Sequence, residues 1–525
     1  MNTNASLFSL GGDIIESEII PLLTLEEMNT FKATCKTLSK LVEKSSYIWK
    51  EQFKKTFGTK PTPFALSKWP ELYRLRSRGK LYAWGTMSGG RLGFAAREVP
   101  KENLSRARFN LGVCKPTQVP RISENTVLAD VSAGGFSFQI LTSDGDIFST
   151  GSYNQGHYGD PGPIDDDFDQ FRHSIVGQNH LSHILPLNIG NTGANTLDGV
   201  SPVFRTPMTL TDINSRPYIT TQIGGIQSEP NSHISNIFLN KETANGTSNI
   251  KFISVSSGRS HFIALDSSGS LWSWDRSKFG VKIRFENQDG TDLENLGHKV
   301  LRAVAGWDSS VAYLYRFGLV YWTKRFNLKE GDKDALALYK LIPYTSDISG
   351  VNKVTEFLAL EGCLIYLTSE GRVFKNDFVG EASYELSKFS ARLKDMSRSL
   401  SPKFIRLTGS FRSFAVFSNE DFVFLGTNTS SEPEIIDELQ CEGCVNVSFG
   451  DYHSLALLKD GTILSWGLES NNCGCLGLGQ ADFVIHNHQG INDGGLRVTK
   501  PTIVPIERKA IAIAAGGWQS SAIMV

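Results

Sequence analysis

The sequence predicts a mainly β protein with a small all-α segment in front of it. Two observations carry this prediction. From residue 79 onward one phrase recurs, in which a glycine is followed five residues later by tryptophan. A second glycine stands 11 residues before the next opening glycine. Before residue 79 the apolar residues recur instead at intervals of three and four, which is the helical period. A chain of 525 residues exceeds one ordinary core, but a repeat array can occupy most of it.

Residues 10–55 form the helical segment. Asp13 is expected to cap a first helix, with Glu16 three places later, and Pro21 weakens that helix. Its apolar face is expected to hold Ile14, Ile15, Ile19, Leu22 and Leu23. Thr24 and Glu27 have the spacing of a capping box for a second helix. Its apolar residues continue at helical spacing through Leu25, Met28, Phe31, Cys35, Leu38, Leu41 and Val42, and Ile48-Trp49 closes the segment.

This segment resembles an F-box. The matching features are the apolar first helix, Thr34-Cys35-Lys36 and the terminal Ile48-Trp49. It departs from the family at Gly11-Gly12, where Leu-Pro is usual, and at Leu38, where an aromatic residue is common. The resemblance implies docking on the Skp adaptor of a cullin-RING ubiquitin ligase. The residues expected to bind that adaptor are Ile14, Ile15, Ile19, Leu22, Leu25, Cys35, Lys36, Leu41 and Trp49. The alternative is an unrelated helical cap.

Residues 56–78 are expected to link the two parts. Lys60–Pro63 should be extended because a residue that precedes proline avoids the α region. A short helix should begin at Trp69, with Pro70 in its first turn. The basic residues around this link are interpreted as a solvated face, with a patch for nucleic acid or an acidic partner as the alternative.

The repeats occupy residues 79–525. Complete opening phrases begin at Gly79, Gly269 and Gly461. Weaker copies begin at Gly145, Gly318 and Gly371. Seven closing phrases are found, headed by Gly134, Gly258, Gly306, Leu360, Gly409, Gly450 and Gly516. The opening Gly79–Gly85 and the closing Gly450–Ser454 resemble the regulator of chromosome condensation repeat. That family implies a seven-bladed β-propeller, here preceded by the small all-α F-box-like domain.

Each closing phrase runs directly into the next opening strand, so a hairpin should straddle two sequence repeats. The last closing phrase, 515–523, has no successor, and the first opening strand, Leu81–Trp84, has no predecessor. These two strands are expected to pair and so to remove both exposed sheet edges. Three insertions interrupt the repeats at about 159–252, 376–400 and 479–500, and Tyr384–Phe389 in the second could be a short helix.

The candidate chemical groups favour structural roles. His261 and His453 occupy equivalent slots of different repeats, which predicts buried imidazoles that hydrogen-bond between strands and argues against catalysis. Cys441, Cys444, Cys473 and Cys475 suggest zinc only weakly, because the second pair is spaced by a single residue. The acidic cluster Asp165–Asp169 is interpreted as a solvated loop, with cation binding as the alternative. No enzyme, metal site or cofactor is expected.

Composition sets further bounds. A net charge of −1 argues against a nucleic-acid-binding domain. Seven unevenly spaced cysteines do not suggest a secreted disulfide framework. The N-terminus lacks a signal-peptide pattern, and no apolar run reaches the length of a membrane span. A soluble protein of the cytoplasm or the nucleus is expected.

These features favour the substrate-recognition subunit of an SCF-type (cullin-RING) ubiquitin ligase, in which the helices dock on the Skp adaptor and the propeller recruits a target protein. The pairing is similar to that in fungal SCF-associated F-box proteins, and this resemblance implies a purine-salvage deaminase as a possible target. The alternatives are a small-GTPase exchange factor or chromatin-binding propeller, and a scaffold unconnected with ubiquitin.

Overall fold

The computed structural model supports a description of most of the helices and the repeat region. The described residues are 11–23, 25–58, 63–64, 68–106, 111–120, 122–151, 234–236, 238–239, 250–274, 279–286, 299–323, 334–346, 352–380, 382–396, 405–418, 422–488, 490–492 and 495–525. Thr24, Lys60–Pro61 and the acidic cluster Asp165–Asp169 lie outside them, and so does most of the insertion 159–252.

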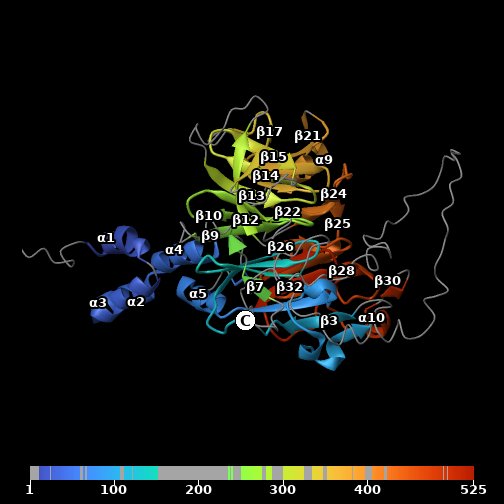
Figure 1. Ribbon diagram of the computed structural model, residues 1–525, viewed down its shortest axis with the longest axis horizontal. Coiled ribbons are helices and arrows are strands. Elements are labelled where there is room, and N and C mark those ends of the chain that lie inside the picture. The colour runs from blue at the N-terminus through green and yellow to red at the C-terminus, as the bar shows by residue number, and fades with distance from the viewer. Residues whose placement is uncertain are drawn as a thin grey trace, which may run out of the picture. The chain divides into compact units, whose positions relative to one another are not determined.

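The N-terminal segment is a set of short helices (Figure 1). They are α1 (Gly12–Ile14), η2 (Ile15–Ile19), η3 (Ile20–Leu22), α2 (Leu25–Thr34), α3 (Lys36–Lys44), α4 (Ser46–Phe57) and α5 (Trp69–Ser77). Ser45 caps α4, since its hydroxyl accepts the amide of Ile48 at 3.0 Å. Helix α5 has Pro70 in its first turn, as predicted.

The first helical stretch differs from the expectation in two ways. Asp13 lies inside α1, whose N-cap is Gly11, so the prediction that Asp13 caps the helix is wrong. The stretch then widens into a π-helical turn, in which the Ile20 amide bonds to the Ile15 carbonyl. This i→i+5 spacing brings Ile15 and Ile20 to the buried face. The face expected from the α-helical period included Ile15 but omitted Ile20, and it also included Ile14 and Leu22, both of which are exposed.

The described strands of the repeat region form seven sheets. Sheet 1 contains β4 (Leu128–Ala133), β5 (Phe138–Thr142), β6 (Ile147–Thr150) and β7 (Ile234–Asn236). Sheet 2 contains β9 (Phe252–Ser257), β10 (Phe262–Asp266), β11 (Leu271–Trp274), β12 (Phe279–Glu286), β16 (Asp334–Leu338) and, beside β12, β8 (Phe238–Leu239). Sheet 3 contains β13 (Val300–Ala305), β14 (Ser309–Leu314), β15 (Gly318–Thr323) and β17 (Lys340–Leu341).

The remaining sheets follow in chain order. Sheet 4 contains β18 (Val354–Ala359), β19 (Cys363–Thr368), β20 (Val373–Asp377) and β21 (Ser383–Glu385). Sheet 5 contains β22 (Ile405–Ser410), β23 (Ser413–Ser418), β24 (Val423–Thr427) and β25 (Glu434–Ile435). Sheet 6 contains β26 (Cys444–Phe449), β27 (His453–Leu458), β28 (Ile463–Ser470), β30 (Gly495–Ile503) and β29 (Ile491–Asn492). Sheet 7 contains β31 (Ala510–Gly516), β32 (Gln519–Met524), β1 (Lys80–Thr86), β3 (Leu111–Gln118) and β2 (Leu104–Arg106).

The sheets form a closed ring. The first strand of each sheet contacts the first strand of the next, and β31 of sheet 7 contacts β4 of sheet 1. Sheet 7 joins the two ends of the array, because β1 pairs antiparallel with β32 in the register Leu81↔Ile523 and Trp84↔Ser520. The predicted closure is therefore confirmed, and the architecture is a seven-bladed β-propeller.

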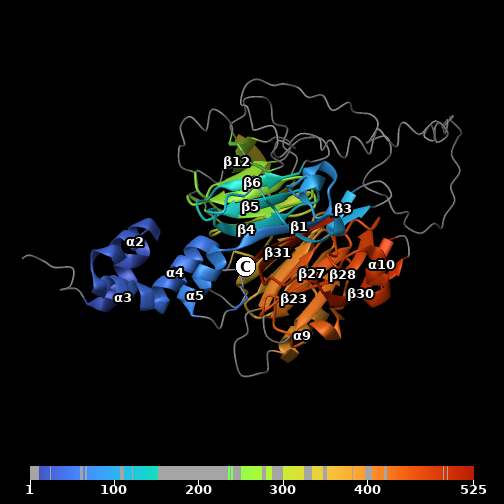
Figure 2. The ribbon, with the colours of Figure 1, turned by 90° about the horizontal axis from the view of Figure 1, so that it is seen from below.

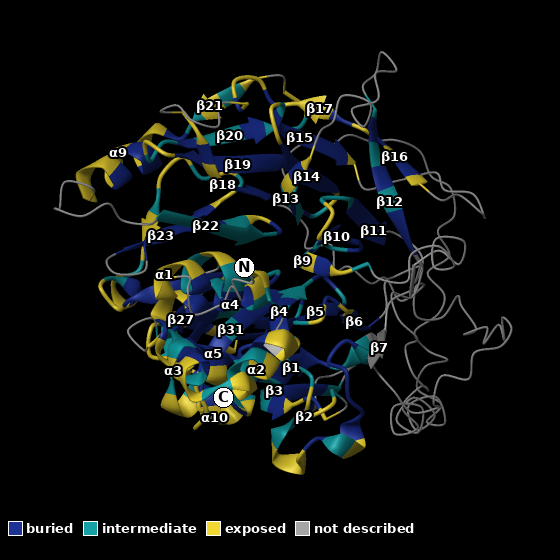
Figure 3. Cartoon of the chain, turned by 90° about the vertical axis from the view of Figure 1, so that its left-hand side faces the viewer, coloured by how far each residue is buried: buried dark blue, intermediate teal, exposed yellow. Residues whose placement is uncertain are grey.

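The apolar core fills the spaces between neighbouring sheets. Separate clusters lie between sheets 2 and 3, 3 and 4, 4 and 5, and 5 and 6. A larger one spans sheets 6, 7 and 1. Figure 3 shows the strands of sheets 3 and 4 as mostly buried. Burying both faces of a sheet between its neighbours explains why the strands carry continuous apolar runs.

Polar side chains also join one first strand to the next. The hydroxyl of Ser132 accepts the amide of Ser257, and the hydroxyl of Ser256 accepts the amide of Ala305. Ser448 repeats this contact with the amide of Ala515 at 2.8 Å. These bonds satisfy backbone amides of the innermost strand of each sheet, because that strand has no neighbouring strand of its own sheet on the side of the channel.

The insertions add elements to the rim of the ring. Helix α9 (Ser387–Met396) lies in the second insertion, but it begins after Tyr384 and Glu385, which form part of β21. The predicted helix at Tyr384–Phe389 is thus displaced, because these two residues pair with Lys375 and Phe374 of β20. Helix α10 (Ala481–Asn487) lies in the third insertion. No helix in the described ranges is both long and apolar enough to cross a membrane.

Candidate functional site

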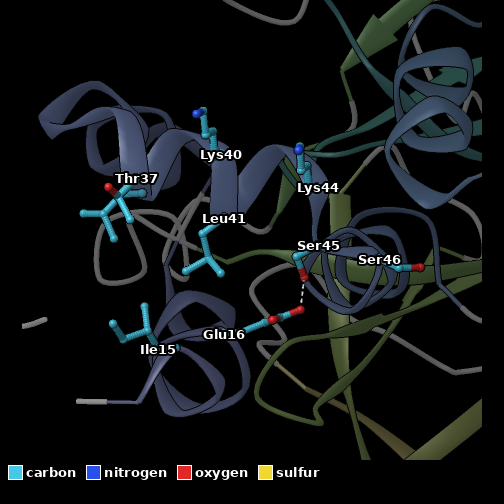
Figure 4. A pocket seen from close by; sticks show the side chains of 10 residues that line it. Ile15, Glu16, Thr37, Lys40, Leu41, Lys44, Ser45 and Ser46 are labelled. Carbon is cyan, nitrogen blue, oxygen red and sulfur yellow. Dashed lines mark hydrogen bonds between the residues drawn. The ribbon is translucent and has the colours of Figure 1, made fainter. Parts of the chain in front are cut away.

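A groove in the N-terminal helices is the candidate functional site. It has a volume of about 590 Å³ and lies between the first helical turns and helix α3. Figure 4 shows Ile15 and Glu16 on one side, with Thr37, Lys40, Leu41 and Lys44 on the other. Ser45 and Ser46, at the start of α4, close one end. Its floor is therefore apolar and its edge is polar.

Helix α3 gives the groove its basic edge. Lys36, Lys40 and Lys44 follow one another at intervals of four, so they line one face of the helix, and all three are exposed. Thr37 and Leu41 form the next row, which turns toward the groove. An apolar floor beside a row of ammonium groups fits a partner that presents apolar side chains flanked by carboxylates.

One polar contact fixes the groove's end. The hydroxyl of Ser45 donates to the carboxylate of Glu16 while it accepts the amide of Ile48, so it links the π-helical turn to α4. The indole of Trp49 donates to the carbonyl of Val42 at 2.8 Å and joins α4 to α3. Gln52 similarly donates to the carbonyl of Leu23. Side-chain hydrogen bonds therefore hold these helices together in addition to apolar packing.

The residues predicted to bind an adaptor fall into two sets in the structure. Ile14 and Leu22 are exposed to 43% and 81%, and Cys35, Lys36 and Leu41 are at least partly accessible. Ile15 and Trp49 are buried, and Trp49 packs on Tyr73 with ring centroids 5.0 Å apart. Ile19 is half-buried, and the side chain of Leu25 lies outside the described part. Thr37, Lys40 and Lys44 were missed, although their spacing with Leu41 was visible in the sequence.

The helices are attached to the propeller at the beginning of its first strands. The guanidinium of Arg76 in α5 donates to the carbonyls of Leu128 and Ala129 in β4. Arg76 is buried and lies over the ring of Phe57. Burial lowers the pKa of Arg76 to about 10. The expectation that the basic residues of this segment are all solvated is therefore wrong for Arg76. Figure 2 shows α4 and α5 beside this part of the ring.

The two histidines of the closing phrases are structural. His453 is buried, and its Nε2 lies 2.7 Å from the hydroxyl of Ser520 in the next sheet. Burial lowers the pKa of His453 to about 4, so the ring is neutral. His261 contacts Ser310 of the next sheet in the same way, at 2.8 Å. The predicted hydrogen bonding between strands is confirmed, and it joins neighbouring sheets.

The cysteines do not converge on a metal site in the described structure. Cys441 is exposed in a turn, while Cys444 is buried in β26. Burial raises the pKa of Cys444 to about 12, which disfavours the thiolate that zinc requires. Cys473 and Cys475 lie instead against sheet 7, where the Cys475 carbonyl accepts from Trp84 and Ser520. Across the described ranges no group of three His, Cys, Asp or Glu side chains could hold a metal ion.

Known proteins resemble this chain in both its helical segment and its repeats. Residues 444–475 match the family model "Regulator of chromosome condensation (RCC1) repeat". SCF-associated factor 1 of Saccharomyces cerevisiae is 28% identical over 98% of this chain and 97% of its own. F-box protein pof9 of Schizosaccharomyces pombe is 26% identical over 61% of this chain and 69% of its own.

Solved structures support the fold. Prp20p of Saccharomyces cerevisiae matches with a TM-score of 0.53 and 12% identity, over 90% of this chain and 94% of that chain. A chain in the crystal structure of Kap60 bound to yeast RCC1 (Prp20) matches equally well. At this identity the likeness concerns the fold alone. The resemblance predicted from the sequence is thereby confirmed: over nearly its whole length the chain is similar to SCF-associated factor 1, and its repeats fold as a seven-bladed propeller of the regulator of chromosome condensation type.

Proposed function

We propose that the protein is a non-catalytic, substrate-recognition adaptor of an SCF-type ubiquitin ligase. The observation that carries the proposal is the similarity to SCF-associated factor 1, which extends through the helices as well as the propeller. A second relative, pof9 of Schizosaccharomyces pombe, is an F-box protein by name. The likeness to Prp20 supports the fold only, so it gives no separate support to an exchange factor.

In this proposal residues 1–55 dock on the Skp adaptor, and the propeller of residues 79–525 binds the substrate. Residues 56–78 link these two parts. The exposed Ile14 and Leu22 would enter apolar pockets of the adaptor, and the lysines of α3 would face its carboxylates. Ile15 and Trp49 would act indirectly, because they support the groove from the core. A small helical unit that leaves large apolar side chains in water is suited to a permanent partner.

The protein's contribution to ubiquitination would be proximity. A substrate held on the propeller reaches the ligase's catalytic machinery at a high effective concentration, so the adaptor needs no catalytic groups of its own. The substrate would be a protein, and a purine-salvage deaminase is the candidate that the resemblance suggests. Such a complex would operate in the cytoplasm or the nucleus.

The test is co-purification with the Skp adaptor. We expect the variant Ile14→Asp/Leu22→Asp to lose the adaptor, because both residues are exposed and each change buries an unpaired carboxylate in the interface. The control is Val379→Asp, which places one such carboxylate on a residue of the propeller that is 98% exposed. Thermal melting should be unchanged in both variants. Retention of the adaptor by the double variant, or absence of the adaptor from the wild type, would refute the proposal.

A further inference from the structure

The mouth of the propeller's central channel carries an unusual group of side chains. The channel has a volume of about 750 Å³ and is lined by the first strands of the sheets. The N-terminal helices contact the beginning of these strands, at Leu128 and Ala129. At the other end, directly after the strands, the closing phrases bring together Arg259, Trp307, Phe411 and Asp451. This end therefore lies opposite the one that the N-terminal helices contact.

Aromatic rings and guanidinium groups alternate across this mouth. The guanidinium of Arg259 lies 4.3 Å from the ring centroid of Trp307 and 5.8 Å from that of Phe136. Trp307 stacks on Phe411 with centroids 4.0 Å apart, and Arg412 covers Phe411 at 4.7 Å. We call Phe136, Arg259, Trp307, Phe411 and Arg412 the mouth ladder. Trp307 belongs to sheet 3 and Phe411 to sheet 5, so their stacking crosses the position of sheet 4.

One residue of the ladder, Phe411, has an unfavourable backbone conformation that neighbouring hydrogen bonds hold in place. Phe411 has φ of 52°, a left-handed conformation that is costly for an aromatic residue. Its carbonyl accepts the amide of Glu361 at 2.7 Å, and the carbonyl of Arg412 accepts the amide of Asn428 at the same distance. Strain of this kind is often found where the chain holds a ligand. Here it turns the Phe411 ring toward Trp307.

Arg259 differs from the other arginines at the mouth. Arg91 donates to the carbonyls of Ser88 and Gly135, and Arg412 pairs with the carboxylate of Glu361. Within the described residues the side chain of Arg259 donates no hydrogen bond and forms no close ion pair, although the buried carboxylate of Asp451 lies near enough to be stabilised by its charge. Its planar group is fixed between two rings with its donors uncommitted, which is the geometry that binds a carboxylate with two parallel hydrogen bonds.

The surrounding charges select among anionic partners. Asp308 is exposed beside the ladder, and Glu361 and Asp451 also lie at the mouth. A continuous phosphate backbone would meet these carboxylates, whereas a peptide that carries separated carboxylates can place one on Arg259 and avoid the others. The ring of Tyr452, which is 40% exposed, offers apolar contact to the rest of such a peptide.

We propose that the mouth ladder is the substrate-docking surface of the propeller and that it takes an acidic peptide segment of a protein, with one carboxylate on Arg259. The proposal rests on the proposed function, since it names the surface through which that function would recognise its substrate. Arginine and tryptophan at the centre of a contact, surrounded by polar residues, are the usual composition of an interaction hot spot.

The test uses the full-length protein and short fluorescein-labelled peptides. One peptide has glutamate at alternate positions, a second has glutamine in their place, and the third probe is an oligothymidylate. Fluorescence anisotropy should show tighter binding of the glutamate peptide than of its glutamine counterpart, by about tenfold or more. Arg259→Ala should remove this preference. Arg259→Lys should weaken it too, because an ammonium group cannot form the two parallel bonds.

The matched control is Arg508→Ala, since Arg508 likewise lies over an aromatic ring, that of Tyr82 at 5.9 Å, and is exposed. It should bind the glutamate peptide like the wild type. Equal affinity for the glutamate and glutamine peptides, undiminished binding by Arg259→Ala, or preference for the oligothymidylate would each overturn the proposal. Retention of the Skp adaptor by Arg259→Ala, measured separately, distinguishes a failure here from a failure of the proposed function.

Discussion

His453 makes the stability of the propeller depend on pH in a predictable direction. Its folded-state pKa is about 4, against 6.5 for an unperturbed imidazole, because burial disfavours the charged ring. Between these values the unfolded chain binds a proton that the folded protein does not. The stability contributed by the neutral ring is therefore complete above about pH 6.5 and is lost as the pH falls toward 4. From pH 7 to pH 5 this loss amounts to about 2 kcal/mol.

The variant His453→Gln isolates this effect. Glutamine is native to the equivalent slot of the last closing phrase, where the amide of Gln519 donates to the carbonyls of Gly134 and Ser137 in sheet 1. The replacement can therefore keep a bond to the neighbouring sheet, but it cannot be protonated near neutral pH. Urea denaturation at pH 7 and pH 5 should show that the wild type loses about 2 kcal/mol more stability on acidification than the variant.

His486→Gln is the control, because His486 is an exposed histidine of α10. Its unfolding curves should shift with pH in parallel with those of the wild type. The reasoning is refuted if His453→Gln and the wild type lose the same stability between pH 7 and pH 5. It is also refuted if acidification weakens the variant more than the wild type.

The other structural predictions concern the closure of the ring and the attachment of the helices. Deletion of the last ten residues, 516–525, removes β32 from between β1 and β31, so we expect loss of cooperative unfolding by circular dichroism; an unchanged melting profile would contradict closure by these strands. Arg76→Met removes the two hydrogen bonds from α5 to β4, and it should destabilise the protein by about 3 kcal/mol. Hydrogen exchange should then quicken in α5 and at Leu128–Ala133, whereas equal protection in both proteins would show that apolar packing alone holds the helices.

The repeat region was largely predictable because glycines recur at fixed positions in its turns. Gly145, Gly269 and Gly461 have φ of 92°, 88° and 80°, so the turns that they form require glycine, and their spacing marked the hairpins. The same logic located β32 as the partner of β1. The pairing of β16 with β12 was not foreseeable, because β16 comes from the segment between β15 and β17 and carries no glycine signature.

The helical site was only partly predictable. Ile15 and Leu41 were expected together, and they line one groove. The period of 3.6 residues failed at Ile20, since a π-helical turn adds a residue and rotates the helical positions after it. The mouth ladder was not predicted at all, although each of its members stands one to three residues after the head of a closing phrase. Their chemistry varies from repeat to repeat, and only the closed ring places Trp307 against Phe411.

The pairing of β12 with β16 also has a consequence for the order in which the ring can be completed. Residues 334–338 form the outer strand of sheet 2, yet they follow β13, β14 and β15 in the chain. During synthesis from the N-terminus, Ile283 and Phe285 of β12 must wait for most of sheet 3 before they gain these parallel neighbours. Strand β1 can pair early with β3, but its other edge waits longer still, because the partner there is residues 519–524. The ring therefore acquires its final form only after almost the whole chain has left the ribosome, and until then its sheet edges are open to chaperones.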